Sequence, residues 1–212
     1  RKLSKMVFGA FLVLMLGLVY FSFNVLADTA SGQIGILNTG PTAGTVTLYN
    51  QAGADAAITL SAGSTVVVTA NVTITDTNGG GDILFANATL YHNTSTVGAA
   101  DDENVHLTNS SCALGTASGN TRLVTCSFTM NYMALNDTWT ASIIANDSAG
   151  ASATGTDTNT VSDLAGLDVV DSTIDLGSLQ LGANSSSATT MTVRSQGNVQ
   201  IDARYSGNDY TC

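Results

Sequence analysis

The sequence predicts an all-β protein that is preceded by one apolar α-helix. Residues 6–27 contain no charged side chain. After Asp28 the apolar residues alternate with Thr, Asn and Ser at the period of two that marks a half-buried strand. Gly and Asn interrupt this alternation about every ten residues, which is typical of a β-sandwich. We therefore expect a hydrophobic helix over 1–30, an immunoglobulin-like sandwich over 31–160 and a second small β unit over 161–212.

The first region determines where the protein resides. As a helix, Met6–Ala27 would be about 33 Å long, which is enough to cross a bilayer. Three cations precede this run and Asp28 follows it, so the positive-inside rule places the remaining chain outside the cytoplasm. The run fits a secretory signal cleaved near Ala27, a retained membrane anchor, or a pilin-like helix that leaves the membrane for a filament core. Because the chain starts at Arg1 rather than Met, we expect that an upstream segment was removed, and we favour the filament helix.

In the filament interpretation, Leu3–Ala27 packs against copies of itself as a helical homopolymer and is inserted in the membrane before assembly. The side chains expected to pack between subunits are Phe8, Phe11, Leu14, Gly17, Leu18 and Phe21.

The charge distribution excludes nucleic-acid binding. Charged residues make up 10% of the chain, and after residue 27 there is no lysine. Three arginines, Arg122, Arg194 and Arg204, stand against 16 acidic residues there, which gives a net charge of −13. Affinity for phosphates depends on clustered Lys and Arg, and this region has no such cluster.

Four long runs in the second region each have one apolar face. We expect Trp139 at the centre of the core, because it is the chain's one tryptophan and lies on an apolar face. Shorter runs at 32–37, 45–50 and 56–63 would supply edge or pairing strands, and 148–163 would be an edge strand or a linker. The predicted inward sets are Val66, Val68, Ala70, Val72 and Ile74; Leu84, Ala86, Ala88 and Leu90; Val124, Cys126, Phe128 and Met130; and Trp139, Ala141, Ile143 and Ala145.

The third region alternates in the same way but has only about 50 residues, a size at which a core is marginal by itself. We leave three interpretations open. A neighbouring subunit completes the unit by β-augmentation, the natural chain continues past Cys212, or a small sheet packs on the first domain.

The arrangement of an apolar helix followed directly by a β-rich head with many Thr, Asn and Gly residues resembles archaeal type IV pilins and archaellins. The chain departs from that family in carrying Arg1, Lys2 and Lys5 in a stretch that is usually apolar there. The run DLGSLQLG and the following TTMTVRSQGNVQIDARYSGNDYTC resemble β-sandwich repeats of uncharacterised archaeal surface proteins. The resemblance implies a cell-surface location and assembly into a filament.

Two cysteines are placed to form a disulfide. Cys112 and Cys126 flank a stretch rich in Gly, Ser and Asn and would close a loop in an oxidising compartment. The alternative is a buried free Cys126 with Cys112 in a loop. Cys212 is left over and is either free or paired with a cysteine outside the printed chain.

Seven Asn-X-Ser/Thr triplets are candidate sites for N-linked glycans. Two of them, at Asn71 and Asn87, lie opposite the apolar face of their strands, where sugars would cover an exposed sheet. Asn in ordinary turns is the alternative reading. The seven positions are Asn71, Asn87, Asn93, Asn109, Asn136, Asn146 and Asn184.

One segment carries oxygen ligands that would suit calcium. DTNGGGD places Asp76, Asn78 and Asp82 around glycines that permit a tight loop. No Glu follows at the position that an EF-hand requires. A Gly-rich turn between two strands would account for the same residues. We favour the turn. The acidic residues 101–103 are interpreted as a solvated loop.

The residues that enzymes use are sparse, so we expect no catalytic activity and no cofactor. The sequence has no GxSxG, no CxxC and no phosphate-binding loop, and His92 and His106 fit no motif. We therefore expect a structural subunit of an extracellular pilus-like filament with glycosylated heads, used for adhesion or surface contact. The alternatives are a membrane-anchored monomeric adhesin or envelope protein, and a protein secreted after cleavage near Ala27.

Overall fold

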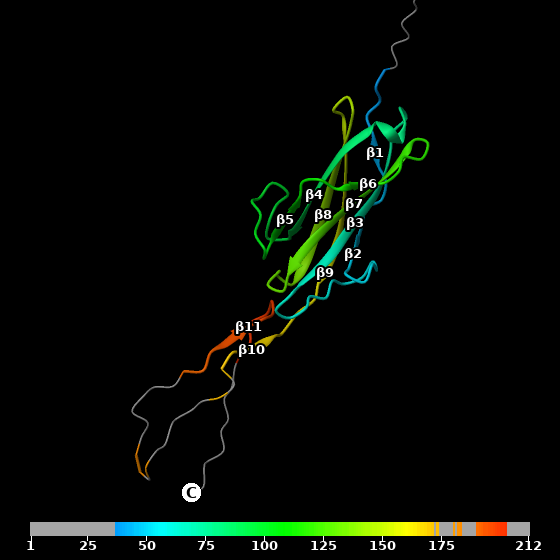
Figure 1. The fold of residues 1–212 in the computed structure, drawn as a ribbon. Coiled ribbons are helices and arrows are strands. Elements are labelled where there is room, and N and C mark those ends of the chain that lie inside the picture. The colour runs from blue at the N-terminus through cyan, green and yellow to red at the C-terminus, as the bar shows by residue number, and fades with distance from the viewer. Residues whose placement is uncertain (1–36, 172, 174–179, 181, 184–189, 203–212) are drawn as a thin grey trace, which may run out of the picture. The chain divides into compact units, whose positions relative to one another are not determined.

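The structure is a computed structural model that describes residues 37–171, 173, 180, 182–183 and 190–202 (Figure 1). Chain contacts divide the protein into residues 1–37 and 38–212, and every element described belongs to the second unit. The described part is all-β, which confirms the predicted class of the head. The helix expected over 1–30 and most of the run 32–37 lie outside the described residues.

The first sheet is built around two long antiparallel strands. β3 (Thr65–Thr75) and β7 (Thr121–Asn131) pair over their whole lengths, from Thr65 with Asn131 to Thr75 with Thr121. Two short strands share the free edge of β3, and one short strand pairs with the other side of β7. These short strands are β1 (Thr42–Ala43), β2 (Thr47–Tyr49) and β6 (Ala113–Leu114).

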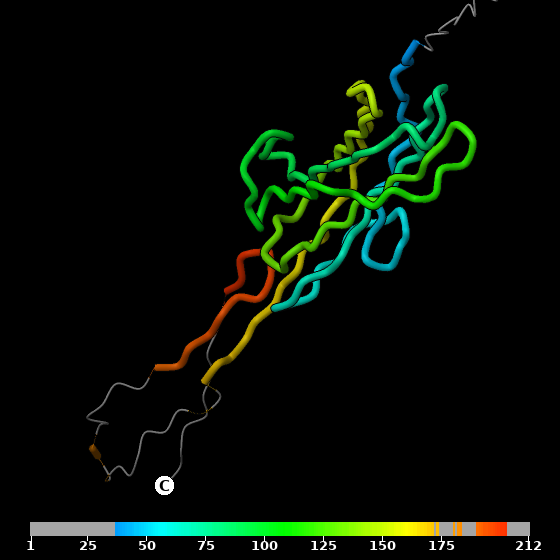
Figure 2. The backbone as a smooth tube through the Cα atoms, turned by 45° about the horizontal axis from the view of Figure 1, so that its top comes forward, coloured from blue at the N-terminus to red at the C-terminus, as the bar shows by residue number. Residues whose placement is uncertain are grey.

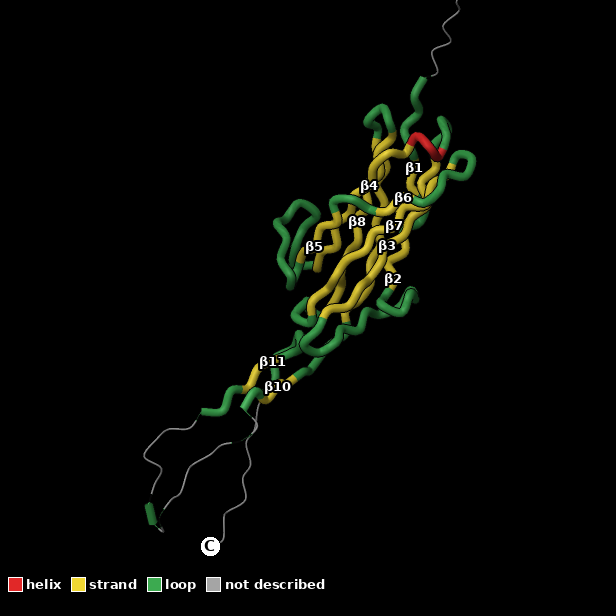
Figure 3. Tube along the Cα trace, viewed as in Figure 1, coloured by secondary structure: helices red, strands yellow, loops and turns green. Residues whose placement is uncertain are grey.

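The second sheet has four antiparallel strands in the order β5-β4-β8-β9. The central pair, β4 and β8, runs from Ile83 opposite Asp147 to His92 opposite Trp139. Figure 3 shows the long strands of both sheets in yellow and the one short 3-10 helix, η1 (Gly80–Asp82), in red. The strands of this sheet are β4 (Ile83–His92), β5 (His106–Asn109), β8 (Asp137–Asp147) and β9 (Ser152–Val161).

The inward faces of the two sheets share one apolar core. On β7 and β8 all eight residues predicted to face inward are buried. On β3 the four from Val68 to Ile74 are buried, whereas Val66, near the end of the strand, is half-buried. Trp139 is fully buried and donates its indole N–H to the carbonyl of Leu135 at 2.8 Å. The tryptophan therefore buries its apolar ring without leaving its polar atom unpaired.

The predicted inward position of Leu84 is wrong. Its side chain is 61% exposed, and Ile83 is buried in its place. The register of β4 against β8 shifts between Ile83 and Phe85, which marks a β-bulge. A bulge inserts one residue into the strand and reverses the alternation on one side of it, so the pattern predicted from Ala86 onwards does not extend back to Leu84.

The segment predicted as an edge strand or a linker is an edge strand. β9 pairs with β8 from Asp137 opposite Val161 to Asn146 opposite Ser152. Of the run 56–63, only Ile58 makes a strand-like contact, a parallel bridge to Val161. This bridge covers one end of the β9 edge, which limits the length of exposed backbone that another chain could pair with.

Beyond the predicted boundary at residue 160, the described residues contain one small antiparallel sheet, β10 (Leu167–Val169) with β11 (Val193–Ser195). Asn198 holds the following turn to the sandwich. Its side-chain amide donates to the carbonyls of Ala134 and Ser162, and its oxygen accepts the amide of Leu164. These bonds place the second small β unit in direct contact with the sandwich. The other strands predicted for this small unit lie mostly outside the described residues.

Replacement of the central tryptophan tests the core. Trp139→Ala should lower the free energy of unfolding by about 3–5 kcal/mol, because it removes a fully buried aromatic side chain and leaves a cavity. Denaturant titration of the full chain in mild detergent measures this change. The matched control is Thr158→Ala on the outer face of β9, which should change the free energy by less than about 0.5 kcal/mol. Equal effects of the two substitutions would contradict the assignment of Trp139 to the core.

Candidate functional sites

Three carboxylates meet at one end of the sandwich. Asp76 follows β3, Asp82 ends η1 just before β4, and Asp147 is the last residue of β8. One carboxylate oxygen from each lies within 4.8 Å of the other two. Figure 2 shows the blue start of the described chain, the loop from β3 to β4 and the yellow turn from β8 to β9 at this same end. We call Asp76, Asp82 and Asp147 the acidic cluster.

The glycine-rich loop positions the first two members of the cluster. Asp76 accepts the amide of Asn78 at 2.7 Å through Oδ1, which is an Asx turn. Gly79 has a φ of 119°, a conformation that favours glycine. A Cβ at Gly80 would lie 2.1 Å from the carbonyl oxygen of Thr121. The loop thus requires glycine at both positions for steric reasons, as the turn interpretation expects.

Asp147 is held by hydrogen bonds from two sides. Its Oδ2 accepts the side-chain amide of Asn38 at 2.8 Å, and its Oδ1 accepts the backbone amides of Ala149 and Ala151 at 3.0 and 2.8 Å. The bond from Asn38, together with these amides, holds the pKa of the Asp147 carboxyl below its usual value, against the opposing effect of burial. Asp147 is therefore ionised at neutral pH.

Asp76 is the member with an unsatisfied atom. Its side chain is 1% exposed, and its Oδ2 is buried with no hydrogen-bond partner. Asp82 is half-buried and accepts a hydrogen bond from the hydroxyl of Ser148, which belongs to the turn after β8. The cluster therefore joins the ends of strands from both sheets.

Asp76, Asn78 and Asp82 were named together from the sequence as candidate oxygen ligands, and in the structure Asp76 and Asp82 lie together with Asp147 instead of Asn78. The structure has the side-chain oxygen of Asn78 accepting the backbone amide of Thr39 at 2.8 Å. Asp147 lies 65 positions after Asp82, so no local spacing connects them. One signal was present, because Asp147 continues the inward phase of Trp139 and Ala145 at a position where an apolar residue is the norm.

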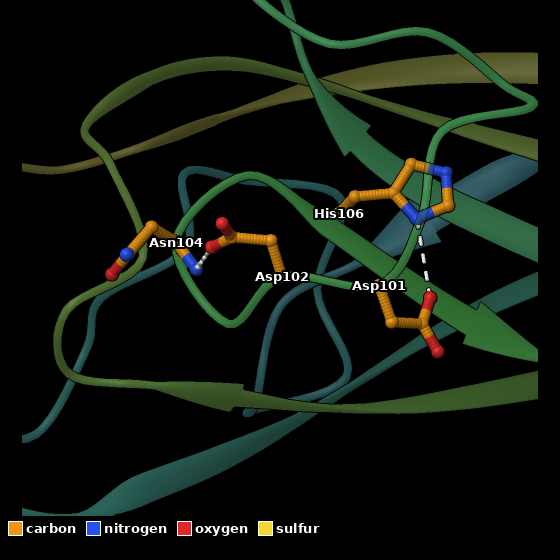
Figure 4. Close-up of polar contacts among 4 residues, drawn as sticks. All are labelled: Asp101, Asp102, Asn104 and His106. Carbon is orange, nitrogen blue, oxygen red and sulfur yellow. Dashed lines mark hydrogen bonds and ion pairs between the residues drawn. The ribbon is translucent and has the colours of Figure 1, made fainter.

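A second polar group consists of the loop before β5 and the first residue of that strand, His106 (Figure 4). His106 is 1% exposed, and its Nδ1 is 3.2 Å from Oδ1 of the exposed Asp101. A hydrogen bond from Thr108 is the main cause that lowers the pKa of the Asp101 carboxyl, and His106 adds to it. The neighbouring Asp102 instead accepts the backbone amide of Asn104 at 2.8 Å. The predicted solvated acidic loop is thus partly tied to a buried histidine.

The other histidine is enclosed by partners. His92 contacts the hydroxyl of Thr94 through Nδ1 at 2.8 Å and the carbonyl of Asn136 through Nε2 at 2.9 Å. Its ring packs edge-on against Trp139, with 5.7 Å between ring centroids. Both ring nitrogens of His92 therefore hold loops to the end of the second sheet.

Cys112 and Cys126 are joined by a disulfide, the pair that the sequence analysis expected. Cys112 directly precedes β6, and Cys126 lies within β7, so the bridge connects neighbouring strands of one sheet. The backbone amide of Cys112 also donates to the carbonyl of Ala86 on β4, in the other sheet. The bridge therefore anchors the point where the chain crosses from the second sheet to the first.

The candidate glycosylation sites fall into two groups, and their glycosylation stays a prediction. Asn71, Asn87 and Asn146 lie on half-buried outward positions of β3, β4 and β8. The other three described sites already donate through their side-chain amides. A glycosylated amide keeps one hydrogen for such a bond. The donations are Asn93 to Asp137 Oδ2 at 3.1 Å, Asn109 to the Ser127 carbonyl at 2.9 Å and Asn136 to Asp163 Oδ1 at 2.6 Å.

The remaining sites named in the sequence lie outside the described residues. These are Asn184, Cys212 and the six assembly residues from Phe8 to Phe21. Within the described ranges, the structure contains no helix with the length and apolarity needed to cross a membrane.

Comparison of the sequence with models of known protein families and with curated proteins finds no match.

Reduction of the disulfide tests its energetic role. The bridge closes a loop of about 15 residues, so reducing it should lower the free energy of unfolding by about 3 kcal/mol. Denaturant titration with and without dithiothreitol measures the loss. A double variant, Cys112→Ala with Cys126→Ala, retains only Cys212 and should not respond to the reductant. An unchanged wild-type midpoint under reducing conditions would contradict this role.

The hydrogen bond to Asp147 predicts a pH dependence. Because the folded-state pKa of the Asp147 carboxyl lies below its usual value, the stabilisation is complete above the unfolded pKa and is lost as pH falls through the folded one. Asn38→Ala should therefore reduce the slope of unfolding free energy between about pH 5 and pH 2. Asn104→Ala is the matched control, since its exposed side chain makes no hydrogen bond within the part of the chain that the structure describes. Identical slopes in both variants would contradict the prediction.

Proposed function

We propose that this protein is a structural subunit of an extracellular pilus-like filament. One observation carries the proposal: the uncharged run Met6–Ala27 leads into a disulfide-bonded β-sandwich. Disulfides persist mainly in oxidising compartments, which supports a head outside the cytoplasm. The positive-inside rule, applied to the basic residues before Met6, supports the same side of the membrane.

The order of strands supports an immunoglobulin-like sandwich as the finer description of the head. Immunoglobulin-like domains have sheets ABED and CFG, with a C′ strand beside C in some members. The first sheet corresponds if β1 and β2 share the role of A, with β3 as B, β7 as E and β6 as D. The second corresponds with β4 as C, β8 as F, β9 as G and β5 as C′.

Two features of this head differ from antibody domains. Antibody domains carry a disulfide between strands B and F in different sheets, and a buried tryptophan on strand C. Here Cys126 lies on β7, in the place of E, and bonds to a cysteine next to D. Trp139 lies on β8, in the place of F. The proposal therefore concerns strand topology and implies no antibody-like binding loops.

The proposed mechanism is assembly through Leu3–Ala27. A helix satisfies its own backbone hydrogen bonds, so this segment can exchange lipid neighbours for protein neighbours without exposing unpaired amides. The heads would form the outer sheath. The polar outer face of β9 suits this position, because Thr154, Thr156, Thr158 and Thr160 are exposed along it. Half-buried Asn87 and Asn146 offer glycan attachment points.

A charged residue in the apolar segment tests assembly. Gly17→Lys should abolish filaments seen by negative stain, because a lysine in the packed helical core would be buried without a partner. The matched control is Gly98→Lys, at an exposed loop position where a Cβ meets nothing within 4 Å. This control adds the same charge to the head and should assemble normally. Normal filaments from the Gly17 variant would refute the proposal.

The intact mass of the native subunit separates the alternatives. A filament subunit or an anchored adhesin retains its apolar segment, whereas a secreted protein begins at Asp28. Detergent extraction then distinguishes the first two, since an anchored adhesin is released as a monomer and a filament as intact fibres. A loss of mass after enzymatic deglycosylation would also reveal attached glycans.

A further inference from the structure

We propose that the acidic cluster of Asp76, Asp82 and Asp147 binds a hard divalent cation, Ca²⁺, and that the cation fastens the ends of the two sheets together. The proposal is independent of filament assembly, because all three residues belong to the sandwich. It rests on the charge balance of the cluster, on the unpartnered oxygen of Asp76 and on the chemistry of the ligands.

Among the described residues, the cluster has no protein counter-ion. Within the described ranges, the one ion pair within 4.0 Å joins His106, the first residue of β5, to Asp101 in the preceding loop, and neither belongs to the cluster. Arg122 comes from the strand beside β3, but its guanidinium donates to the carbonyls of Gly115 and Ile83. Carboxylates this close repel one another unless a proton or a cation lies among them.

Asp76 supplies the observation that separates this cluster from an ordinary acidic surface. Its carboxylate is almost completely buried, yet Oδ2 has no hydrogen-bond partner. Burying a polar atom without a partner is costly, and more so for an ionised group. Oδ1 of the same group accepts the amide of Asn78, which fixes the orientation of the carboxylate. The carboxylate that carries the unpaired oxygen is therefore held in place, and it lies beside two further carboxylates.

The ligand chemistry favours calcium over the other common metals. The cluster contains only carboxylates and no His or Cys, whereas zinc prefers nitrogen and sulfur ligands. Oxygens that share one Ca²⁺ at about 2.3–2.6 Å lie no more than about 5.2 Å apart, and the three carboxylates meet this condition. Three protein residues leave several of the six to eight coordination positions to water, so the affinity should resemble that of extracellular modules, with a Kd of about 1 mM.

A cation at this position would act on the fold as a crosslink. Asp76 and Asp147 end strands of different sheets, and Asp82 begins the connection into β4. Asp147 also accepts a hydrogen bond from Asn38, at the point where the chain enters the sandwich. Ca²⁺ would therefore order the loop from β3 to β4, the turn after β8 and the entering chain together.

The test is the thermal midpoint of the full chain in mild detergent, with and without Ca²⁺. After treatment with EDTA, adding CaCl₂ to about 10 mM at matched ionic strength should raise the Tm by about 3–6 °C, because the cation binds the folded state only. MgCl₂ at the same concentration should raise it by less, since Mg²⁺ demands shorter contacts and tighter octahedral geometry.

Substitutions in the cluster give this test its specificity. Asp76→Asn should abolish the response to Ca²⁺ while the Tm in EDTA stays equal or rises, because one of three repelling charges is gone. Asp82→Asn, at a half-buried position, serves as a second variant if the first does not fold. Asp55→Asn is the matched control on an exposed loop and should keep the full response.

Three results would overturn the proposal. The first is a wild-type Tm that Ca²⁺ does not change, which would favour a proton shared among the carboxylates. The second is a variant of Asp76 or Asp82 that keeps the wild-type response. An equal rise with Mg²⁺ would overturn the assignment to calcium.

Discussion

The packing of the two sheets against each other is the interaction on which the other features of the head depend. Each sheet contributes a central pair of long strands whose inward side chains interlock around Trp139 and Ile143. This core determines which loops meet at each end. The acidic cluster, for example, exists only because β3 and β8 end at the same end of the sandwich, although they are far apart in sequence.

Much of the fold was predictable because the burial of the long strands follows a period of two over most of their length. The inward sets of β7 and β8 could be predicted from the alternation of apolar and polar residues, since the inward side chains are buried. The outward ones are half-buried or exposed on β7 and mostly half-buried on β8. The exposure of Leu84 could not be predicted, because a bulge depends on how β4 pairs with β8 and not on the sequence of β4 alone. The pairing of the strands could not be predicted from the sequence either, because register is a property of two segments.

The candidate sites were likewise predictable where their residues are close in sequence, and not where the fold brings distant residues together. Asp76 and Asp82 share one short glycine-rich loop, and the cysteine pair is only 14 positions apart, so local spacing was informative. Asp147 joins the cluster through the tertiary fold. Its best sequence signal is an acidic residue in the inward phase of an apolar strand, where burial of a charge requires a partner. His106 and Asp101 were named in the sequence, but only the fold brings their side chains together.

The placement of the disulfide has a consequence for how the head would respond to proteases and to pulling forces. The bridge lies within one sheet and encloses the loop before β7, most of whose side chains are exposed. A protease that cuts this loop between Cys112 and Cys126 would leave both fragments covalently joined. The same bridge does not connect the two sheets to each other. Under tension the sheets would resist separation by their shared core and by cross-sheet hydrogen bonds such as that from Arg122 to the carbonyl of Ile83. The segment between the cysteines would stay closed as a unit.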